Sequence, residues 1–222
     1  MRIIVEDVRS KGFQDCIIYW FEKGNRDLSW RKQSLNPWQW LVLELLVKKT
    51  RAETVNTFYP VFIEKYHNPK VVAEFSDQEL EEDLKPLGLQ RQRRVALKRI
   101  AKKIILEYNG KVPLDYDSLR SLSYVGRYMG NAILCFSQNE RRSIVDINVA
   151  RVLTRFFGLE MPKDAREEWI WELAEKMLPL KKWKEYNYGL LDLGALVCKS
   201  RFPKCITCVL QDNCTYNGTK TN

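Results

Sequence analysis

Four cysteines crowd together near the C-terminus of the sequence, and their spacing suits metal binding. They follow a Cys-x6-Cys-x2-Cys-x5-Cys pattern and comprise Cys198, Cys205, Cys208 and Cys214. Clustered cysteines in a chain without a secretion signal indicate a metal site rather than a disulfide framework. Structural zinc usually takes two Cys-x2-Cys knuckles, whereas this stretch has one close pair flanked by wider gaps. The quartet therefore predicts a metal centre, with zinc as the less well-fitting alternative.

Two carboxylates occupy positions where acid–base chemistry is possible. Asp146 stands at the expected N-cap of a helix that reaches Phe157. Glu44 lies inside the apolar run from Leu41 to Val47, where an unpaired ionised carboxylate would be costly. Burial favours the neutral acid, which suits a group that must hold or donate a proton. The structural alternatives are a helix cap for Asp146 and a buried acid paired with an arginine for Glu44.

A glycine-containing turn between two helical segments is a candidate seat for phosphate. The turn reads Leu122-Ser-Tyr-Val-Gly-Arg-Tyr128, and apolar residues at helical spacing follow it as far as Phe136. A helix that begins after such a turn presents unpaired backbone N–H groups and the positive end of its dipole. The alternative is a helical hairpin with a purely structural role.

Charge and composition favour a globular protein with a polyanionic partner. The chain has 37 basic and 28 acidic residues, a formal net charge of +9, and 45% hydrophobic residues. An excess of positive charge is compatible with nucleic-acid binding. The N-terminus lacks the apolar run of a signal peptide, and no stretch is long and apolar enough to span a membrane. We therefore expect an intracellular, cytoplasmic protein, associated with the nucleoid if DNA is its partner.

Hydrophobic periodicity predicts helices throughout and no convincing strand. Ser76 and Glu79 form an expected capping box at the start of one helix. A following helix over 91–103 carries seven cations and no acid, and we expect its apolar stripe to dock while its basic face stays in solvent. The other expected helices are 8–23, 38–49, 54–66, 116–122, 147–157, 165–178 and 183–197.

The hairpin and the aspartate segment together resemble the endonuclease III superfamily of DNA glycosylases. The resemblance rests on Leu122–Tyr128 and on Val145-Asp-Ile-Asn-Val-Ala-Arg-Val152. It implies an all-α, two-lobed helix-hairpin-helix fold in which the cysteine quartet at 198–214 holds a [4Fe–4S] cluster. The implied domains are a central helical bundle of residues 30–136, and a second domain of residues 1–29 and 137–222. One departure is Tyr124, which replaces a usual glycine and would cost about 1–2 kcal/mol if that position needs a positive φ.

The resemblance also implies roles for three candidate catalytic residues. Asp146 would steady the positive charge that develops on the sugar and activate a water molecule. Glu44 matches a glutamate shared by the adenine and mismatch-specific thymine branches, and Tyr128 would line the base pocket. Bifunctional members carry a lysine at the position of Tyr128, and a phenol cannot form their imine intermediate. The resemblance therefore implies a monofunctional glycosylase without strand cleavage.

Candidate DNA-binding residues lie in the hairpin, in two predicted turns and in the cysteine loop. Two of them, Lys48 and Leu89, occupy places where relatives insert side chains into the gap left by a flipped base. The cations of the cysteine loop would contact phosphate. The set is Lys48, Leu89, Val125, Gly126, Arg127, Lys199, Arg201 and Lys204.

The expected activity is excision of thymine or uracil mispaired with guanine, by a monomer acting on double-stranded DNA with a mismatched or deaminated base. A mispaired base is cheaper to flip out of the duplex. One alternative is an adenine glycosylase acting opposite 8-oxoguanine. Only eight residues follow Cys214, so we expect no lesion-reading domain of that branch. The other alternative is a non-catalytic iron–sulfur DNA-binding module.

Overall fold

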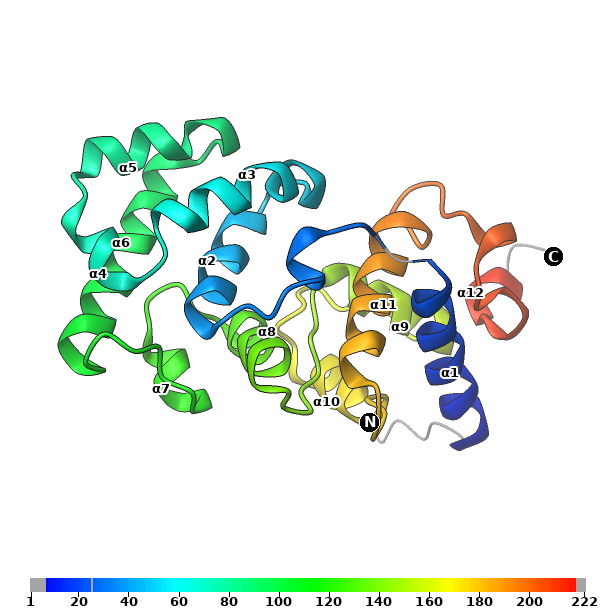
Figure 1. The fold of residues 1–222 in the computed structure, drawn as a ribbon. Coiled ribbons are helices and arrows are strands. Elements are labelled where there is room, and N and C mark those ends of the chain that lie inside the picture. Colours follow the sequence, from blue (N-terminus) through cyan, green and yellow to red (C-terminus); the bar gives the residue numbers. More distant parts are fainter. Residues whose placement is uncertain (1–6, 25, 219–222) are drawn as a thin grey trace. The chain divides into compact units, whose positions relative to one another are not determined.

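All regular secondary structure in the described part of the chain is helical, which confirms the expected all-α fold (Figure 1). The computed structural model describes residues 7–24 and 26–218. Short 3-10 turns η1 (Ser29–Arg31), η2 (Lys85–Leu87), η3 (Cys205–Thr207) and η4 (Gln211–Asn213) lie between α-helices. The α-helices are α1 (Asp7–Lys23), α2 (Pro37–Val47), α3 (Ala52–Lys65), α4 (Pro69–Glu74), α5 (Asp77–Leu84), α6 (Gln90–Glu107), α7 (Tyr116–Ser121), α8 (Arg127–Gln138), α9 (Ile147–Phe157), α10 (Glu168–Lys176), α11 (Trp183–Leu196) and α12 (Thr215–Gly218).

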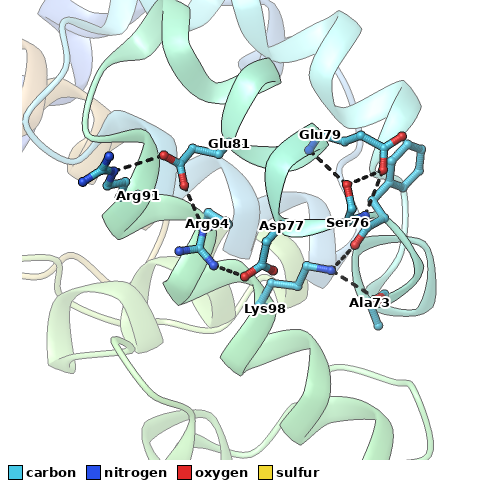
Figure 2. Close-up of polar contacts among 9 residues, drawn as sticks. Ala73, Ser76, Asp77, Glu79, Glu81, Arg91, Arg94 and Lys98 are labelled. Atoms are coloured by element: carbon cyan, nitrogen blue, oxygen red, sulfur yellow. Dashed lines mark hydrogen bonds and ion pairs between the residues drawn. The ribbon is translucent and has the colours of Figure 1, made fainter.

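Local capping signals set the starts of several helices. Asn36 and Gln39 form a reciprocal capping box at the start of α2, with Pro37 in the first turn. The predicted capping box of Ser76 and Glu79 is confirmed at the start of α5 (Figure 2). Helix α4 was not expected, although Asn68 caps it by accepting a hydrogen bond from the Val71 N–H at 3.0 Å.

One compact unit comprises Asp27–Glu140 and is built around α2. This helix is buried on nearly all sides because it packs against α3, α6 and α8. The stacked rings of Trp40 and Phe136, with centroids 4.9 Å apart, join α2 to α8. Helix α6 packs against both α4 and α5 through a stripe of fully buried residues, namely Leu97, Ile100 and Ile104. The predicted docking of this apolar stripe is confirmed.

The other compact unit joins the two ends of the chain, Met1–Arg26 and Arg141–Asn222. Helix α11 packs against α1 and α9, and α12 packs against α9. The ring of Phe13 on α1 lies 4.7 Å from that of Phe156 on α9. The domain boundaries expected from the sequence, at residues 30 and 136, stay a prediction, and the compact units divide at residues 27 and 140.

Candidate functional site

The hairpin joins α7 to α8 and places an exposed glycine at the start of the second helix. Gly126 is the N-cap of α8 and is exposed, and Arg127 is half-buried. Val125 differs, because its side chain is only 4% exposed and its N–H donates to the carbonyl of Leu122 at 3.1 Å. Among the three hairpin residues predicted to bind DNA, Gly126 and Arg127 are thus the ones that reach the surface, and Val125 packs in the hairpin.

Tyr124 adopts the left-handed conformation that the family hairpin normally assigns to glycine. Its φ is +70°, and its side chain is exposed. The hydroxyl group lies 3.5 Å from the guanidinium of Arg99 on α6. A non-glycine residue in this region is strained by about 1–2 kcal/mol. The tyrosine therefore keeps the usual backbone path of the hairpin at a cost in stability.

We expect Tyr124→Gly to be more stable than Tyr124→Ala by about 1 kcal/mol, because both remove the ring but only glycine relieves the strain at positive φ. A difference of this size should separate their melting temperatures by about 2–4 °C in a chain of this length. Thermal denaturation of the two purified variants measures it. Equal melting temperatures of the two variants would contradict the strain at Tyr124. The melting temperature of Tyr124→Ala relative to wild type reports the loss of the Arg99 contact.

Glu44 and Tyr128 lie on two helices that pack against each other within the same unit. Glu44 is buried near the middle of α2, and Tyr128 is half-buried in the first turn of α8. The expected burial of Glu44 is confirmed. Their roles at a base pocket stay a prediction.

The two predicted insertion residues are exposed at the ends of loops in this unit. Lys48 follows the last residue of α2 and is exposed, and Leu89 is the N-cap of α6 with its side chain 41% exposed. Leu89 has a φ of +50°, and Lys49 has a φ of +60°. Leu89 itself is therefore in left-handed backbone, whereas Lys48 is extended and directly precedes a left-handed residue.

The basic face expected on α6 is largely occupied by protein partners, which corrects the sequence prediction (Figure 2). Arg94 pairs with Asp77 and with Glu81, the latter at 3.1 Å, while Lys98 donates to the carbonyl oxygens of Ala73 and Phe75. Arg91 lies 3.3 Å from Glu81. The acidic helix α5 supplies these carboxylates. Of the seven cations, Arg99 and Lys102 remain exposed without a carboxylate partner in the described part of the chain.

In the other unit, Asp146 caps α9, as predicted. One carboxylate oxygen accepts hydrogen bonds from the backbone N–H groups of Asn148 and Val149, at 2.8 and 2.7 Å. The second oxygen accepts from the side-chain amide of Asn148 at 2.8 Å. The carboxylate is half-buried. It is therefore held in one orientation at the positive end of the helix dipole.

A chain of hydrogen bonds leads from Asp146 to the cysteine loop. Arg151 donates to the side-chain oxygen of Asn148 at 3.0 Å and to the carbonyl oxygen of Cys198 at 2.8 Å. Burial lowers the pKa of the Arg151 guanidinium, and the charges of Cys198 and Asp146 act in the opposite direction. Sequence reasoning quoted Asn148 and Arg151 in the motif but gave them no role. The three-residue spacing of Asn148 and Arg151 is the signal that could have found them, since it places both side chains on one face of the helix that Asp146 caps.

Helix α11 supports this segment from a second side. Asn187 accepts from the N–H of Ile144 at 3.3 Å and donates to the carbonyl oxygen of Arg142 at 2.9 Å. Gly194 lies so close to Asn148 that an added Cβ would be 2.9 Å from the Cβ of Asn148. The glycine thus allows α11 to approach the first turn of α9, where Asp146 is held.

The four cysteines of the predicted metal motif line one cavity at the end of the same unit. The cavity has about 300 Å³ of space free of protein atoms, part of it open to solvent. Arg155 donates a long hydrogen bond of 3.5 Å to the sulfur of Cys198. Burial and, less strongly, the neighbouring thiols raise the pKa of Cys208 to about 11. In the described residues, no three cysteine, histidine or acidic side chains converge as they would around a single metal ion.

The cations predicted to contact phosphate from this loop are all at the surface. Lys199, Arg201 and Lys204 are exposed between the first two cysteines. Phe202 and Ile206 lie beside them with about nine-tenths of their side chains exposed. Within the part of the chain that the structure describes, no helix is both long and apolar enough to cross a membrane.

The sequence pattern of the HhH-GPD superfamily of base excision DNA repair proteins matches residues 42–176. The chain belongs to this superfamily. The match includes the hairpin and Asp146, and it ends before the cysteine loop. The resemblance drawn from the hairpin and aspartate motifs is thereby confirmed.

Relatives within the HhH-GPD superfamily share nearly the whole chain. A thymine/uracil-DNA glycosylase of Pyrobaculum aerophilum is 35% identical over 90% of this chain and 89% of its own. The structure of a thermostable thymine-DNA glycosylase is 31% identical and superposes with a TM-score of 0.90 over 96% of this chain and 98% of that one. An endonuclease III from a non-covalent DNA complex, 23% identical, superposes with a TM-score of 0.85 over 98% of this chain and 99% of that one, which shows the shared fold.

Proposed function

We propose that this protein is a monofunctional DNA glycosylase that excises thymine or uracil mispaired with guanine. The observation that carries the proposal is the Asp146 carboxylate, which three hydrogen bonds hold at the N-terminus of α9. The thymine and uracil preference is supported by the names of relatives that share about a third of their residues with this chain. Excision would follow flipping of the mispaired base out of the duplex.

Asp146 would act at the sugar of the flipped nucleotide. Cleavage of the glycosidic bond leaves positive charge on the sugar, and a fixed carboxylate stabilises that charge without reorganising. The same group can orient or deprotonate the attacking water. Because both of its oxygens already accept hydrogen bonds, the carboxylate is oriented before substrate arrives.

Glu44 and Tyr128 would form the base pocket. They lie on packed helices, α2 and α8, of one unit. A buried carboxyl group can donate a proton or hydrogen bond to a pyrimidine oxygen as the base departs. The tyrosine offers an aromatic face to the base and no amine to the sugar, which supports hydrolysis without strand cleavage.

DNA would be held by exposed groups on both units. Gly126 and Arg127 lie at the start of α8, where the positive end of the helix dipole attracts anions such as phosphate. Lys199, Arg201 and Lys204 would contact phosphates from the cysteine loop, while Lys48 and Leu89 would enter the duplex. We include in the proposal that the enzyme acts as a monomer in the compartment that holds the genome.

The cysteine quartet would hold a [4Fe–4S] cluster. The support is that Cys198, Cys205, Cys208 and Cys214 line one cavity, since a cubane cluster needs one thiolate for each of four irons. When bound, the cluster would cross-link the loop and fix its cations for contact with DNA. Arg155 donates to the carbonyl oxygens of Lys199 and Ser200 as well as to the Cys198 sulfur, so it would brace the same loop.

We expect anaerobically purified protein to be brown and to contain about four irons per chain. Cys205→Ser should lower the iron content and make the loop more susceptible to proteolysis, because one ligand is lost. Cys135→Ser provides the control, since this thiol is fully buried in α8 and is not part of the quartet. Metal analysis and visible absorption measure the result. One zinc per chain with no iron would refute the cluster.

A panel of duplexes tests the proposed function. The substrates contain G·T, G·U, adenine opposite 8-oxoguanine, or an oxidised pyrimidine, and the measurement is single-turnover base release. Release from G·T and G·U alone supports the proposal. Release of adenine would favour an adenine glycosylase, which shares Glu44 and Asp146 by resemblance. No release from any duplex, with binding retained, would indicate a non-catalytic DNA-binding module.

A further inference from the structure

Arg93 joins the two loops that present Lys48 and Leu89. Its guanidinium donates to the carbonyl oxygen of Leu46 in the last turn of α2, at 2.8 Å, and to that of Lys48 on the loop that follows α2, at 3.1 Å. It also donates to the hydroxyl of Thr50 at 2.6 Å on the same loop. On the turn that precedes α6, it donates to the carbonyl oxygens of Leu87, at 2.9 Å, and Gly88. One side chain thus ties together two segments about 40 residues apart in sequence.

The placement of this charge is unusual for a structural arginine. Arg93 is only 4% exposed, and it forms no ion pair among the described residues. Its acceptors are four backbone carbonyls and one hydroxyl, so neutral dipoles rather than a carboxylate stabilise the buried cation. A buried charge of this kind is costly unless all its partners stay in place. The hydrogen bonds therefore hold both loops in the conformation observed.

The two loops need such a partner because their backbones are strained. Gly88 has a φ of +71° and a ψ of −179°, a region essentially restricted to glycine. The neighbouring Leu89, and Lys49 on the other loop, are non-glycine residues at positive φ. Conformations of this kind persist when surrounding contacts over-determine them. Arg93 supplies contacts to both loops at once.

The backbone end of the Arg93 side chain lies in the buried face of α6. Arg93 belongs to the same helical stripe as Leu97, Ile100 and Ile104, which are fully buried, and the spacing of four, three and four residues is helical. The guanidinium therefore projects from the buried face of α6. This position in the apolar stripe is the signal by which the sequence could have separated Arg93 from the surface cations around it.

We propose that Arg93 is a positioning residue that fixes the Lys48 loop and the Leu89 turn relative to each other before DNA is bound. Its importance for catalysis rests on the proposed function, in which both side chains enter the gap left by the flipped base. One guanidinium donates to acceptors in both loops. Displacing either loop therefore breaks hydrogen bonds of the group that also holds the other loop. Lys48 and Leu89 are therefore held in fixed positions relative to each other when they meet the duplex.

Amide hydrogen exchange of the free protein tests the connection without any DNA. The Thr50 and Gly88 N–H groups report on the two loops, since each donates to a backbone carbonyl, at 3.1 and 3.0 Å. Arg93→Met should speed exchange at both sites by at least about tenfold. The matched control is Arg94→Met, which removes the same group from the next residue of α6, where it pairs with Asp77 and Glu81. Arg94→Met should leave both sites unchanged.

Thr50→Val gives a second test if Arg93→Met fails to fold. It removes one acceptor of Arg93 on the Lys48 loop while keeping the size of the side chain. We expect faster exchange at Gly88 as well as at Thr50, because the two loops share the guanidinium. Exchange that rises at Thr50 alone would overturn the proposal, and so would unchanged exchange in Arg93→Met.

The effect on base release separates this proposal from the proposed function. Arg93→Met should slow the single-turnover release of uracil from G·U DNA by about tenfold or more, with little change in the affinity for undamaged duplex. Fluorescence of 2-aminopurine beside the mismatch should show equally slowed extrusion. If Arg93→Met extrudes and releases uracil at the wild-type rates, the positioning role is overturned. If the wild-type protein releases neither thymine nor uracil, the proposed function alone is refuted. The hydrogen-exchange comparison of Arg93→Met with Arg94→Met would still decide whether Arg93 couples the loops.

Discussion

Asp146→Asn is expected to slow the release of thymine from a G·T duplex by about 10²–10⁴-fold, the usual range for a positioned acid–base group. The substitution removes the negative charge that would stabilise the sugar cation and the basicity that would activate water. Affinity for the duplex should hold or rise slightly, because one negative charge near the phosphates disappears. Single-turnover release under saturating enzyme, together with duplex titration, measures both effects.

The hydrogen bonds around Asp146 predict a modest loss of stability in the same variant. Asparagine keeps one oxygen for the N–H groups of Asn148 and Val149, but its amide group then faces the amide of Asn148. If Asn148 rotates to relieve this, its own donors face Arg151. One hydrogen bond is lost in either case, at about 1 kcal/mol or somewhat more. The melting temperature should fall by a few degrees.

Ser76→Ala is the matched control for that loss of stability. It removes the cap of α5, far along the chain from the residues assigned to chemistry, at a cost of about 1 kcal/mol. Its excision rate should equal that of wild type, so a slow Asp146→Asn cannot be ascribed to a weakened fold. If folded Asp146→Asn releases thymine at the wild-type rate, then Asp146 is only a helix cap and the mechanism is wrong.

Tyr128→Lys is expected to convert a hydrolase into an enzyme that forms a covalent complex with DNA. A lysine at this position restores the amine that attacks the sugar in bifunctional relatives, and the resulting imine is reduced to a stable cross-link by borohydride. The wild-type protein should give no trapped complex and should leave abasic sites intact. Gel electrophoresis of borohydride-treated reactions and strand-cleavage assays measure the change.

Tyr128→Phe controls for the altered pocket, because it removes the hydroxyl without adding an amine. It should give no cross-link, whatever its excision rate. Trapping of wild-type protein would contradict the monofunctional assignment unless a different lysine is identified as the nucleophile. The absence of trapping in a folded Tyr128→Lys that still binds the duplex would show that this position does not face the sugar.

Features that depend on nearby residues were predictable from the sequence. The caps at Asp146 and Ser76 need only partners two or three residues away, and the structure shows both. The burial of Leu97, Ile100 and Ile104 follows from helical periodicity alone. The positive φ of Tyr124 could be anticipated because the family places a glycine there.

Features that depend on distant partners were not predictable in the same way. Seven cations without an acid between them suggest a solvated face, yet the carboxylates of Asp77 and Glu81 come from a different helix. Arg93 carries the same charge as its neighbours, but its acceptors are backbone groups that a sequence does not display. Side-chain type gives the capacity for an interaction, and the tertiary fold decides the partner.

The unit built from both ends of the chain constrains the order in which this protein can fold during synthesis. Helix α1 is made first, yet it packs on α11, and Arg9 donates to the carbonyl oxygen of Asn213 and the hydroxyl of Thr215. Residues 27–140 form a compact unit of their own and can fold as soon as they leave the ribosome. The apolar side chains of Phe13 and Ile17 lack their partners until α9 and α11 have been made, because Phe13 packs on Phe156 and Tyr186 and Ile17 packs against Gly189. The nascent chain therefore carries a helix with an exposed apolar face until α11 is made, and a chain terminated before Cys214 would leave Arg9 without the hydroxyl of Thr215.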